Sequence, residues 1–109
     1  MANTFKFKTK ANVGVTTVGI YTAPAATTTV VIGITLSNTS GSGVNVGVGI
    51  TRAGTTEDVK LLKNAPIPQG SSLEFMGGNK IVLETNDQIN VDSDTNNSVD
   101  AALTIMEIT

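Results

Sequence analysis

The feature that most constrains this chain is a regular alternation of apolar and polar or small side chains. Val44, Val46 and Val48 alternate with Asn45 and two glycines, and residues 99–108 alternate in the same way. Successive side chains of a β-strand point to opposite faces, whereas a helix repeats every 3.6 residues. The pattern therefore predicts strands that bury one face and leave the other face free.

Turn-forming residues interrupt this alternation at near-regular intervals. Gly, Pro, Asn, Asp and Ser gather at residues 22–26, 38–43, 53–57, 65–70, 77–79, 85–87 and 92–97. The segment nearest to a helix, residues 57–64, is too short to form a stable one by itself. Many short strands separated by such turns are typical of sandwiches and barrels. The sequence predicts an all-β fold, an antiparallel β-sandwich with a jelly-roll-like topology.

Two strongly alternating segments flank the turn at residues 38–43. Segments 29–38 and 44–52 are predicted to pair with each other as a hairpin across this turn. One face of the first segment is predicted to carry all of its large aliphatic residues except Val31, namely Val30, Ile32, Ile34 and Leu36. The second segment would bury its valines and present glycines on the opposite face.

The absent residue types exclude most catalytic chemistry. The chain contains no Cys, His or Trp, so it has no cysteine nucleophile, no Ser-His triad and no ordinary zinc site. A net charge of −2 argues against nucleic acid as a partner, because contacts with phosphates require an excess of Lys and Arg. We therefore expect a protein that is not an enzyme, has no cofactor and does not bind nucleic acid.

Length and hydropathy bound the organisation of the chain. The 109 residues support one domain, 1–109, in which residues 1–12 are a possible extended N-terminal strand or arm. The start of the sequence lacks the apolar core of a signal peptide, and no apolar run is long enough to span a membrane. The sequence predicts no membrane partner and synthesis in a cytoplasm.

One spacing resembles a metal site. Asp92, Asp94 and Asn96 place three oxygen-bearing side chains at alternate positions of a loop, as calcium-binding loops do. The complete EF-hand pattern fails, because Asn97 and Leu103 stand where Gly and Glu are needed. The alternative is a turn stabilised by the Asp and Asn side chains themselves, and the sequence does not decide between the two.

Carboxylates elsewhere could in principle form an acid–base pair. Glu74, Glu84 and Asp87 fall in neighbouring strands and turns, but glycosidases need two carboxyl groups that face each other across a cleft, usually beside aromatic residues. The chain has one Tyr and three Phe. The more economical interpretation is a solvated acidic surface.

Basic residues concentrate at the start of the chain. Lys6, Lys8 and Lys10 alternate with apolar or small residues, whereas from Glu74 onward seven acidic residues accompany the single Lys80. The basic strand could dock on an acidic face, within the subunit or across an interface. It could instead be an edge strand whose lysines discourage uncontrolled pairing. Both interpretations remain open.

Several segments resemble a known family of virion proteins. The resemblance is carried by IYTAPA (20–25), TTVVI (28–32), LSNTS (36–40), PQGSSL (68–73), KIVLE (80–84), DQINV (87–91) and LTIME (103–107). Together they resemble the small β-sandwich structural proteins of tailed bacteriophages, especially marine and cyanobacterial phages, although Asn86 replaces the usual Gly before Asp87. The resemblance implies a β-sandwich on the phage particle, often trimeric, without catalytic residues.

The function expected from this resemblance is capsid decoration. Such a cement protein would form homotrimers on the outer surface of the capsid, contact the major capsid protein, and be made in the host cytoplasm. The alternatives are a neck, tail, baseplate or fibre-base component, or a module that binds carbohydrate or a receptor. The residues predicted to form interfaces are Phe5, Lys6, Phe7, Lys8, Lys10, Thr39, Ser40, Gly41, Ser42, Gly43, Pro66, Ile67 and Pro68.

Overall fold

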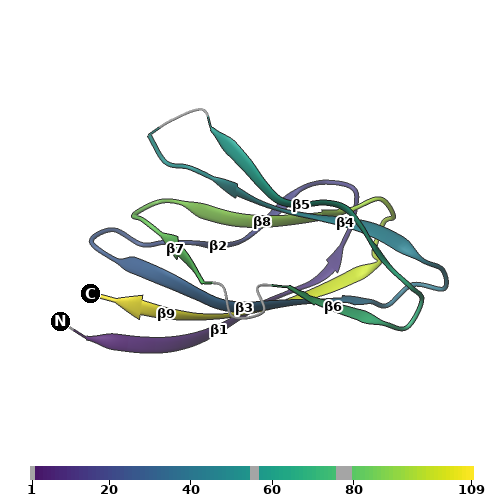
Figure 1. The fold of residues 1–109 in the computed structure, drawn as a ribbon, viewed down its shortest axis with the longest axis horizontal. Coiled ribbons are helices and arrows are strands. Elements are labelled where there is room, and N and C mark those ends of the chain that lie inside the picture. Colours follow the sequence, from purple (N-terminus) through teal and green to yellow (C-terminus); the bar gives the residue numbers. More distant parts are fainter. Residues whose placement is uncertain (1, 55–56, 76–79) are drawn as a thin grey trace.

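The computed structural model describes residues 2–54, 57–75 and 80–109, and within them every regular element is a β-strand. The strands are β1 (Asn3–Val13), β2 (Val18–Thr22), β3 (Thr28–Asn38), β4 (Val44–Thr51), β5 (Asp58–Ile67), β6 (Ser72–Phe75), β7 (Ile81–Leu83), β8 (Gln88–Ser93) and β9 (Val99–Ile108). They form two antiparallel sheets, seen as two layers in Figure 1. None of the described residues belongs to a helix that could cross a membrane.

The strand order explains how the layers are built. Sheet A has the order β1-β9-β3-β6, with β7 also paired to β3, and sheet B has the order β2-β8-β4-β5. Most consecutive strands therefore cross from one sheet to the other, so that neighbours within a sheet come from distant parts of the chain. The predicted antiparallel β-sandwich is confirmed, whereas the jelly-roll-like topology stays a prediction.

The inner faces of the two sheets form the core. Buried aliphatic side chains from β3 and β9 meet those from β4 and β8, where branched residues pack well on a pleated surface. The fully buried large residues include Val31, Ile34, Leu36, Val46, Val48, Ile89, Val91, Leu103 and Ile105. The strands predicted at 44–50 and 99–105 bury the residues that alternation assigned to the core.

The predicted hairpin between 29–38 and 44–52 is wrong. β3 pairs with β9, β6 and β7 in sheet A, whereas β4 pairs with β8 and β5 in sheet B. The loop between them crosses from sheet to sheet and is organised by the buried Asn38 side chain. Its Nδ2 donates to the carbonyls of Ser42 (2.8 Å) and Ile67 (3.0 Å), and its Oδ1 accepts from the Ser40 amide (2.9 Å).

The predicted common face of Val30, Ile32, Ile34 and Leu36 is also wrong. The pairing of β3 with β9 shifts register between Val31 and Gly33, as at a β-bulge. Val31 faces the core before the shift, and Ile34 and Leu36 face it afterwards. Val30 and Ile32 consequently point away from the core, and Ile32 is 37% exposed.

Strand pairing places two segments that the sequence singled out. The N-terminal segment, expected to be an extended strand or arm, contains β1, which pairs with β9 from Asn3 onward and is an edge strand of sheet A. The turn expected at 65–70 begins later, because β5 continues through Pro66 to Ile67. β5 is an edge strand, where a proline can be accommodated because one side of the strand has no partner. The turn expected at 77–79 and residues 55–56 of the loop 53–57 lie outside the described residues.

Candidate functional site

A row of apolar side chains crosses the outer face of sheet A. In the antiparallel register Phe5 of β1 lies opposite Met106 of β9, Met106 lies opposite Val30 of β3, and Val30 lies opposite Val82 of β7. Directly opposed residues of antiparallel strands share a face and lie close together. We call these four residues the outer apolar row. Its two ends are open to solvent, with Phe5 69% and Val82 56% exposed.

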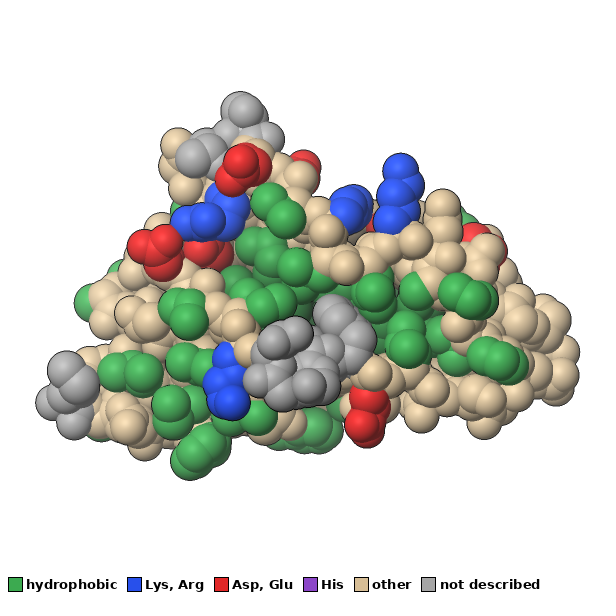
Figure 2. All heavy atoms as spheres, viewed as in Figure 1, with side chains coloured by type: hydrophobic (Ala, Val, Ile, Leu, Met, Phe, Trp, Pro, Cys, Tyr) green, Lys and Arg blue, Asp and Glu red, His purple; other side chains and the backbone are tan. Residues whose placement is uncertain are grey.

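The outer apolar row has apolar neighbours on the same face. Phe7, 66% exposed, follows Phe5 two residues along β1, and the exposed Ile32 lies at the register shift of β3. Figure 2 shows hydrophobic side chains along the lower margin of the molecule, where sheet A lies. Contiguous exposed apolar surface of this kind, unlike scattered single residues, indicates an interaction site.

The lysines of β1 project to the opposite side of the same strand. Lys6, Lys8 and Lys10 lie opposite Ile105, Leu103 and Ala101, which face the core. Because β1 is the edge of sheet A, these lysines lie at the rim of the sandwich, and Lys6 and Lys10 are exposed. Among the described residues, Lys6 forms an ion pair with Glu107 (Nζ–Oε1, 2.9 Å) and no ion pair joins Lys8 or Lys10 to another residue.

Glu107 is the centre of a buried polar network that sequence reasoning missed. Tyr21 donates from its hydroxyl to Glu107 Oε2 (2.5 Å), and the Tyr21 and Thr29 hydroxyls are hydrogen-bonded (2.8 Å). The network therefore joins β2 of sheet B to β3 and β9 of sheet A, and Lys6 extends it to β1. The available signal was the position of Glu107, which continues the core-facing alternation of Leu103 and Ile105 in the last strand.

These contacts shift two pKa values in opposite directions. The hydrogen bonds from Tyr21 and Lys6 lower the pKa of Glu107 below its ordinary value of 4.5, against the opposing effect of burial. Burial, together with the hydrogen bond to Glu107, raises the pKa of Tyr21 to about 12. Near neutral pH, Glu107 is therefore ionised and Tyr21 is protonated, so neither group changes its protonation state there. The hydrogen bond between them joins the two sheets.

Glu84 and Asp87 line one shallow hollow with Arg52, and Glu74 lies apart from them on β6. Glu84 and Asp87 both contact Arg52, at 2.8 Å (Oε1–Nη2) and 3.1 Å (Oδ2–Nε), whereas Glu74 lies on β6 beside Thr35. Glu84 is solvated, as expected, but Asp87 is buried, so that part of the predicted acidic surface is wrong.

Asp87 organises the loop that follows β4. Burial disfavours its ionised form, but the amides of Ala53 (2.9 Å) and Glu84 (3.0 Å) and the charge of Arg52 outweigh this and lower the pKa of Asp87. The carboxylate is thus committed to backbone donors and an ion pair, which is a structural arrangement and not an acid–base pair.

The oxygen atoms of the Asp92–Asn96 segment bond to separate partners. Asp92 accepts from the Thr17 hydroxyl (3.0 Å), Asp94 accepts from the Asn45 amide (3.1 Å), and Asn96 accepts from the Val15 amide (3.5 Å). No group of three metal-ligating side chains occurs in the described parts of the chain. These side chains therefore tie the loop to the segment before β2 and to β4.

Calcium is therefore expected to leave the protein unchanged. A ligand that binds only the folded state raises the melting temperature of the protein, and the rise grows with ligand concentration relative to Kd. The Asp92, Asp94 and Asn96 side chains already accept hydrogen bonds from other residues. We expect no change in melting temperature between 5 mM EGTA and about 5 mM calcium chloride, measured by differential scanning calorimetry. A rise of several degrees that disappears in an Asp94→Asn variant would contradict this interpretation.

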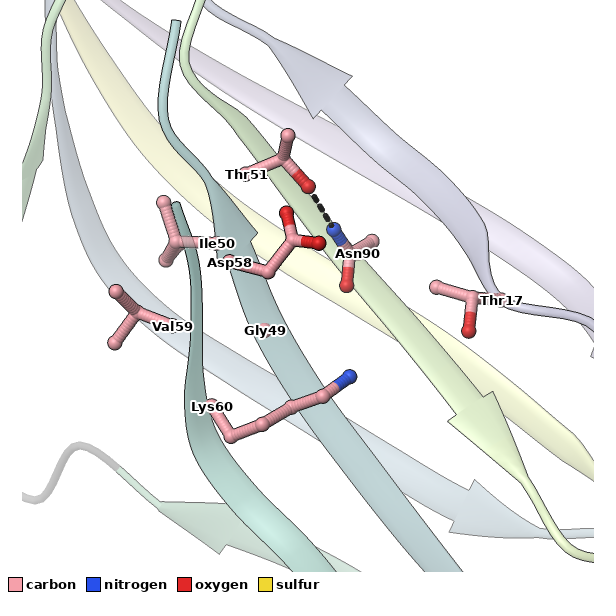
Figure 3. A pocket seen from close by; sticks show the side chains of 8 residues that line it. All are labelled: Thr17, Gly49, Ile50, Thr51, Asp58, Val59, Lys60 and Asn90. Carbon is pink, nitrogen blue, oxygen red and sulfur yellow. Dashed lines mark hydrogen bonds between the residues drawn. The ribbon is translucent and has the colours of Figure 1, made fainter. Parts of the chain in front are cut away.

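The outer face of sheet B is polar and closely packed. A hollow of about 200 Å³ lies over β4, β5 and β8, and Figure 3 shows Lys60, Asp58 and Asn90 around it, with Asn90 donating to Thr51 at 3.1 Å. At Gly49 a Cβ atom would lie 3.0 Å from Asn90 Oδ1 and 3.1 Å from the Val59 carbonyl. The glycine thus lets β5 and a β8 side chain approach closely, and the hollow lacks the apolar lining of a ligand pocket.

The remaining predicted interface residues gather at the far end of the sandwich. The loop of Thr39, Ser40, Gly41, Ser42 and Gly43, exposed except for the half-buried Ser40, adjoins Pro66 and Pro68, because Val44 pairs with Ile67 at the start of β4. Figure 1 places this loop at the right end of the molecule and the N-terminus at the left. Ile67 is 1% exposed, so its side chain belongs to the core and not to a surface.

Comparisons with known proteins show which solved structures share this fold, but they do not assign the chain to a family. No protein-family model matches the chain, and no curated protein sequence matches it. A chain of the Bacillus endospore appendages, which form a family of disulfide-linked pili, has a TM-score of 0.60 at 14% identity and covers 99% of this chain and 87% of its own. A chain of the acidic stable capsid of Helicobacter pylori bacteriophage KHP30 has a TM-score of 0.60 at 10% identity, covering 100% and 89%.

A third likeness involves a larger protein. A chain of infectious bursal disease virus, Gx strain, has a TM-score of 0.54 at 12% identity, and the match covers 95% of this chain but 32% of that one. At such low identity these likenesses show that the β-sandwich architecture is shared, and nothing further. The chain is an all-β protein of two packed antiparallel sheets, with an exposed apolar row on one outer face.

Proposed function

We propose that this protein is a non-enzymatic structural component of a phage particle, and specifically a capsid decoration protein. In this proposal it forms homotrimers on the outer surface of the head and contacts neighbouring copies of the major capsid protein. The added contact area stabilises the shell against the pressure of the packaged DNA. It is made in the host cytoplasm before it joins the particle.

The observation that carries the proposal is the outer apolar row, with Phe5 at one exposed end and the exposed Phe7 beside it. An exposed aromatic pair on a sheet face is costly for a monomer in solution and gains free energy when a partner covers it. The β-sandwich shared with a chain of a phage capsid, together with the resemblance of the strand and turn segments to phage virion proteins, supports a particle as the place of assembly. The polar networks around Glu107, Asp87 and Asp94 supply stability and not turnover.

Purified protein mixed with undecorated heads of the phage that encodes it is expected to bind in hundreds of copies per head. Phe5→Ser combined with Phe7→Ser is expected to reduce this binding at least tenfold, because both side chains lose their apolar area. The variant should lose less than about 1 kcal/mol of unfolding free energy, because both phenylalanines are already exposed in the single chain. Sedimentation with the heads measures binding, and urea denaturation measures stability.

Val15→Ser is the matched control, because Val15 is 55% exposed but lies outside β1, in the bend before β2. It should leave head binding unchanged. Failure of the wild-type protein to bind heads would contradict the decoration proposal. The trimer is tested separately by analytical ultracentrifugation, where a mass other than three chains would contradict it.

A second candidate is a tail, neck or fibre-base component, which assembles through the same surface. The likeness to a chain of Bacillus pili has the same TM-score as that to the phage capsid chain, so the same fold occurs in a filamentous assembly. Such an assembly could not use disulfide links, because the sequence contains no cysteine. Copy number distinguishes the two: a few dozen copies per particle or fewer would favour the second candidate.

A further inference from the structure

We infer that the free edge of β1 is a docking site for an extended acidic strand of another protein, which would add to sheet A beside Phe5 and Phe7. This deepens the proposed function, because it names the mode of contact and the chemistry of the partner segment. The partner strand would alternate acidic and apolar residues, and it would extend the sheet by antiparallel pairing.

The hydrogen bonds at the start of β1 show which backbone groups face this edge. Ala2 and Thr109 exchange both backbone hydrogen bonds, at 3.1 and 3.0 Å. In an antiparallel ladder such pairs alternate with pairs that form no hydrogen bonds. The backbones of Lys6 and Lys8 therefore bond to β9, and those of Phe5 and Phe7 do not. The amide and carbonyl groups of Phe5 and Phe7 therefore point away from β9.

Among the described residues, no strand forms hydrogen bonds with these outward-pointing groups. In the chain as described, β1 pairs with β9 alone and stands at the end of the strand order of sheet A. Unpaired edge groups of this kind are a template for strand addition. A strand added here would form its hydrogen-bonded pairs with Asn3, Phe5, Phe7 and Thr9.

The side chains of β1 specify the chemistry of the added strand. On the outer face, apolar residues of the partner would lie beside Phe5 and Phe7 and continue the outer apolar row by one strand. On the other face, the partner would meet Lys6, Lys8 and Lys10. Lys8 and Lys10 form no ion pair with any described residue, although the charge of Lys8 contributes to the lowered pKa of Glu107. Acidic side chains opposite them would therefore add ion pairs that the single chain lacks.

The geometry of the ladder strengthens these ion pairs. Because the lysines form hydrogen-bonded pairs with β9, they would occupy the other type of pair towards a new strand. In that type the facing Cα atoms are only about 4.5 Å apart and the side chains are closer. Charge complementarity therefore acts at the positions where cross-strand contact is tightest.

A second copy of β1 does not fit this edge. In the antiparallel registers that place Phe7 opposite Phe5 or opposite itself, Lys6 falls opposite Lys6 or Lys8 of the other copy. Directly opposed like charges destabilise strand pairs, and lysines on an edge strand discourage self-pairing for this reason. The lysines thus protect the edge from copies of the same chain and select an acidic partner.

The test uses two capped octapeptides, one alternating Glu with Val and one alternating Lys with Val. The Glu peptide is expected to bind the wild-type protein and to shift the amide NMR signals of Phe5, Phe7 and Thr9. Lys8→Glu combined with Lys10→Glu should weaken this binding about tenfold or more and should make the Lys peptide the tighter ligand. Both substituted side chains lie at the rim, so the variant is expected to remain folded, which its NMR spectrum reports independently.

A backbone variant separates strand addition from simple charge attraction. Phe7→Pro removes an amide that points to the free edge while leaving the bonds to β9 intact, so it should abolish binding of the Glu peptide at unchanged charge. Phe7→Ser retains that amide and serves as the control for loss of the aromatic ring. Equal binding of the Glu peptide to wild type and to the Lys8/Lys10 variant, shifts at the β5 edge instead of β1, or no binding at millimolar peptide would each overturn the inference.

Failure of the strand-addition inference can be distinguished from failure of the decoration proposal. If the Lys8/Lys10 and Phe7→Pro variants still bind heads as the wild type does, strand addition at β1 is wrong although decoration stands. If the peptides bind as expected but the wild-type protein ignores heads, the edge site stands and the decoration proposal fails.

Discussion

Replacing Glu107 with alanine is expected to lower the free energy of unfolding by about 2–3 kcal/mol at pH 7. Glu107 is buried and accepts hydrogen bonds from Tyr21 and Lys6, so the substitution removes the acceptor that joins sheet B to sheet A. Little of the loss comes from the ion pair itself, because the Lys6 side chain is 43% exposed and solvent screens it. Urea denaturation followed by circular dichroism measures the change.

The contribution of Glu107 is also expected to depend on pH. Its pKa is lower in the folded protein than the ordinary value of 4.5, so its stabilising effect is complete above about pH 5. The effect is lost as the pH falls through the folded pKa. The opposite sign applies to Tyr21, whose pKa is raised to about 12, so its contribution is complete below about pH 10 and is lost as the pH rises through 12.

Glu107→Gln is the matched control, because the amide oxygen can still accept from Tyr21 but carries no charge. At pH 7 the glutamine variant should lose about 1 kcal/mol of unfolding free energy relative to wild type, which is less than the alanine variant loses. The difference from wild type should shrink towards pH 3, where the wild-type carboxylate also loses its charge. Asp87, whose pKa is lowered too, is present in both proteins and cancels in this comparison. A Glu107→Gln difference that stays constant from pH 7 to pH 3 would contradict the assignment.

Asn38→Asp is expected to destabilise the protein by about 3 kcal/mol at pH 7. The Asn38 amide nitrogen donates to two carbonyl oxygens, those of Ser42 and Ile67. A carboxylate in the same place would set a negative charge against both carbonyls in a buried site, or would have to take up a proton. Since these bonds join the loop between the sheets to the end of β5, we expect thermal unfolding to shift by about 10 °C or more.

Two variants distinguish this effect from a general sensitivity of the loop. Ser40→Ala removes one partly buried hydroxyl that donates to Asn38 Oδ1 at 2.7 Å and should cost less than about 1 kcal/mol. Asn38→Ala should fall between the two, because it loses the same donors without adding a charge. If Asn38→Asp proves no more harmful than Asn38→Ala at pH 7 and at pH 9, the buried charge is not the cause.

The candidate surface could be predicted from the sequence only in part. Phe5, Phe7 and the three lysines were placed on opposite sides of one strand by alternation alone, and the structure keeps them there. Val30, Val82 and Met106 could not be added to the same surface, because they come from three other strands. Their meeting with Phe5 depends on which strands are neighbours and in what register.

The burial of Glu107 and Ile67 could not be predicted from the sequence for the same reason. A glutamate in an alternating strand is most often solvated, but Tyr21 supplies a buried hydrogen bond from the other sheet and makes burial acceptable. Ile67 lies between two prolines in a segment expected to be a turn at the surface, yet its pairing with Val44 turns the side chain into the core. In both cases the deciding partner lies far away in the sequence.

The sequence alone determined the all-β class, the antiparallel sandwich and the buried faces of the regular strands at 44–50 and 99–105. Those properties follow from side-chain alternation, which is local to each strand. Only the tertiary structure decided that β3 and β4 belong to different sheets, that a register shift turns Ile32 outward, and that four strands align an apolar row. Strands of both sheets bury the same kinds of aliphatic residue, so alternation states which face is buried but not against which strand, and the choice is made by long-range register and packing.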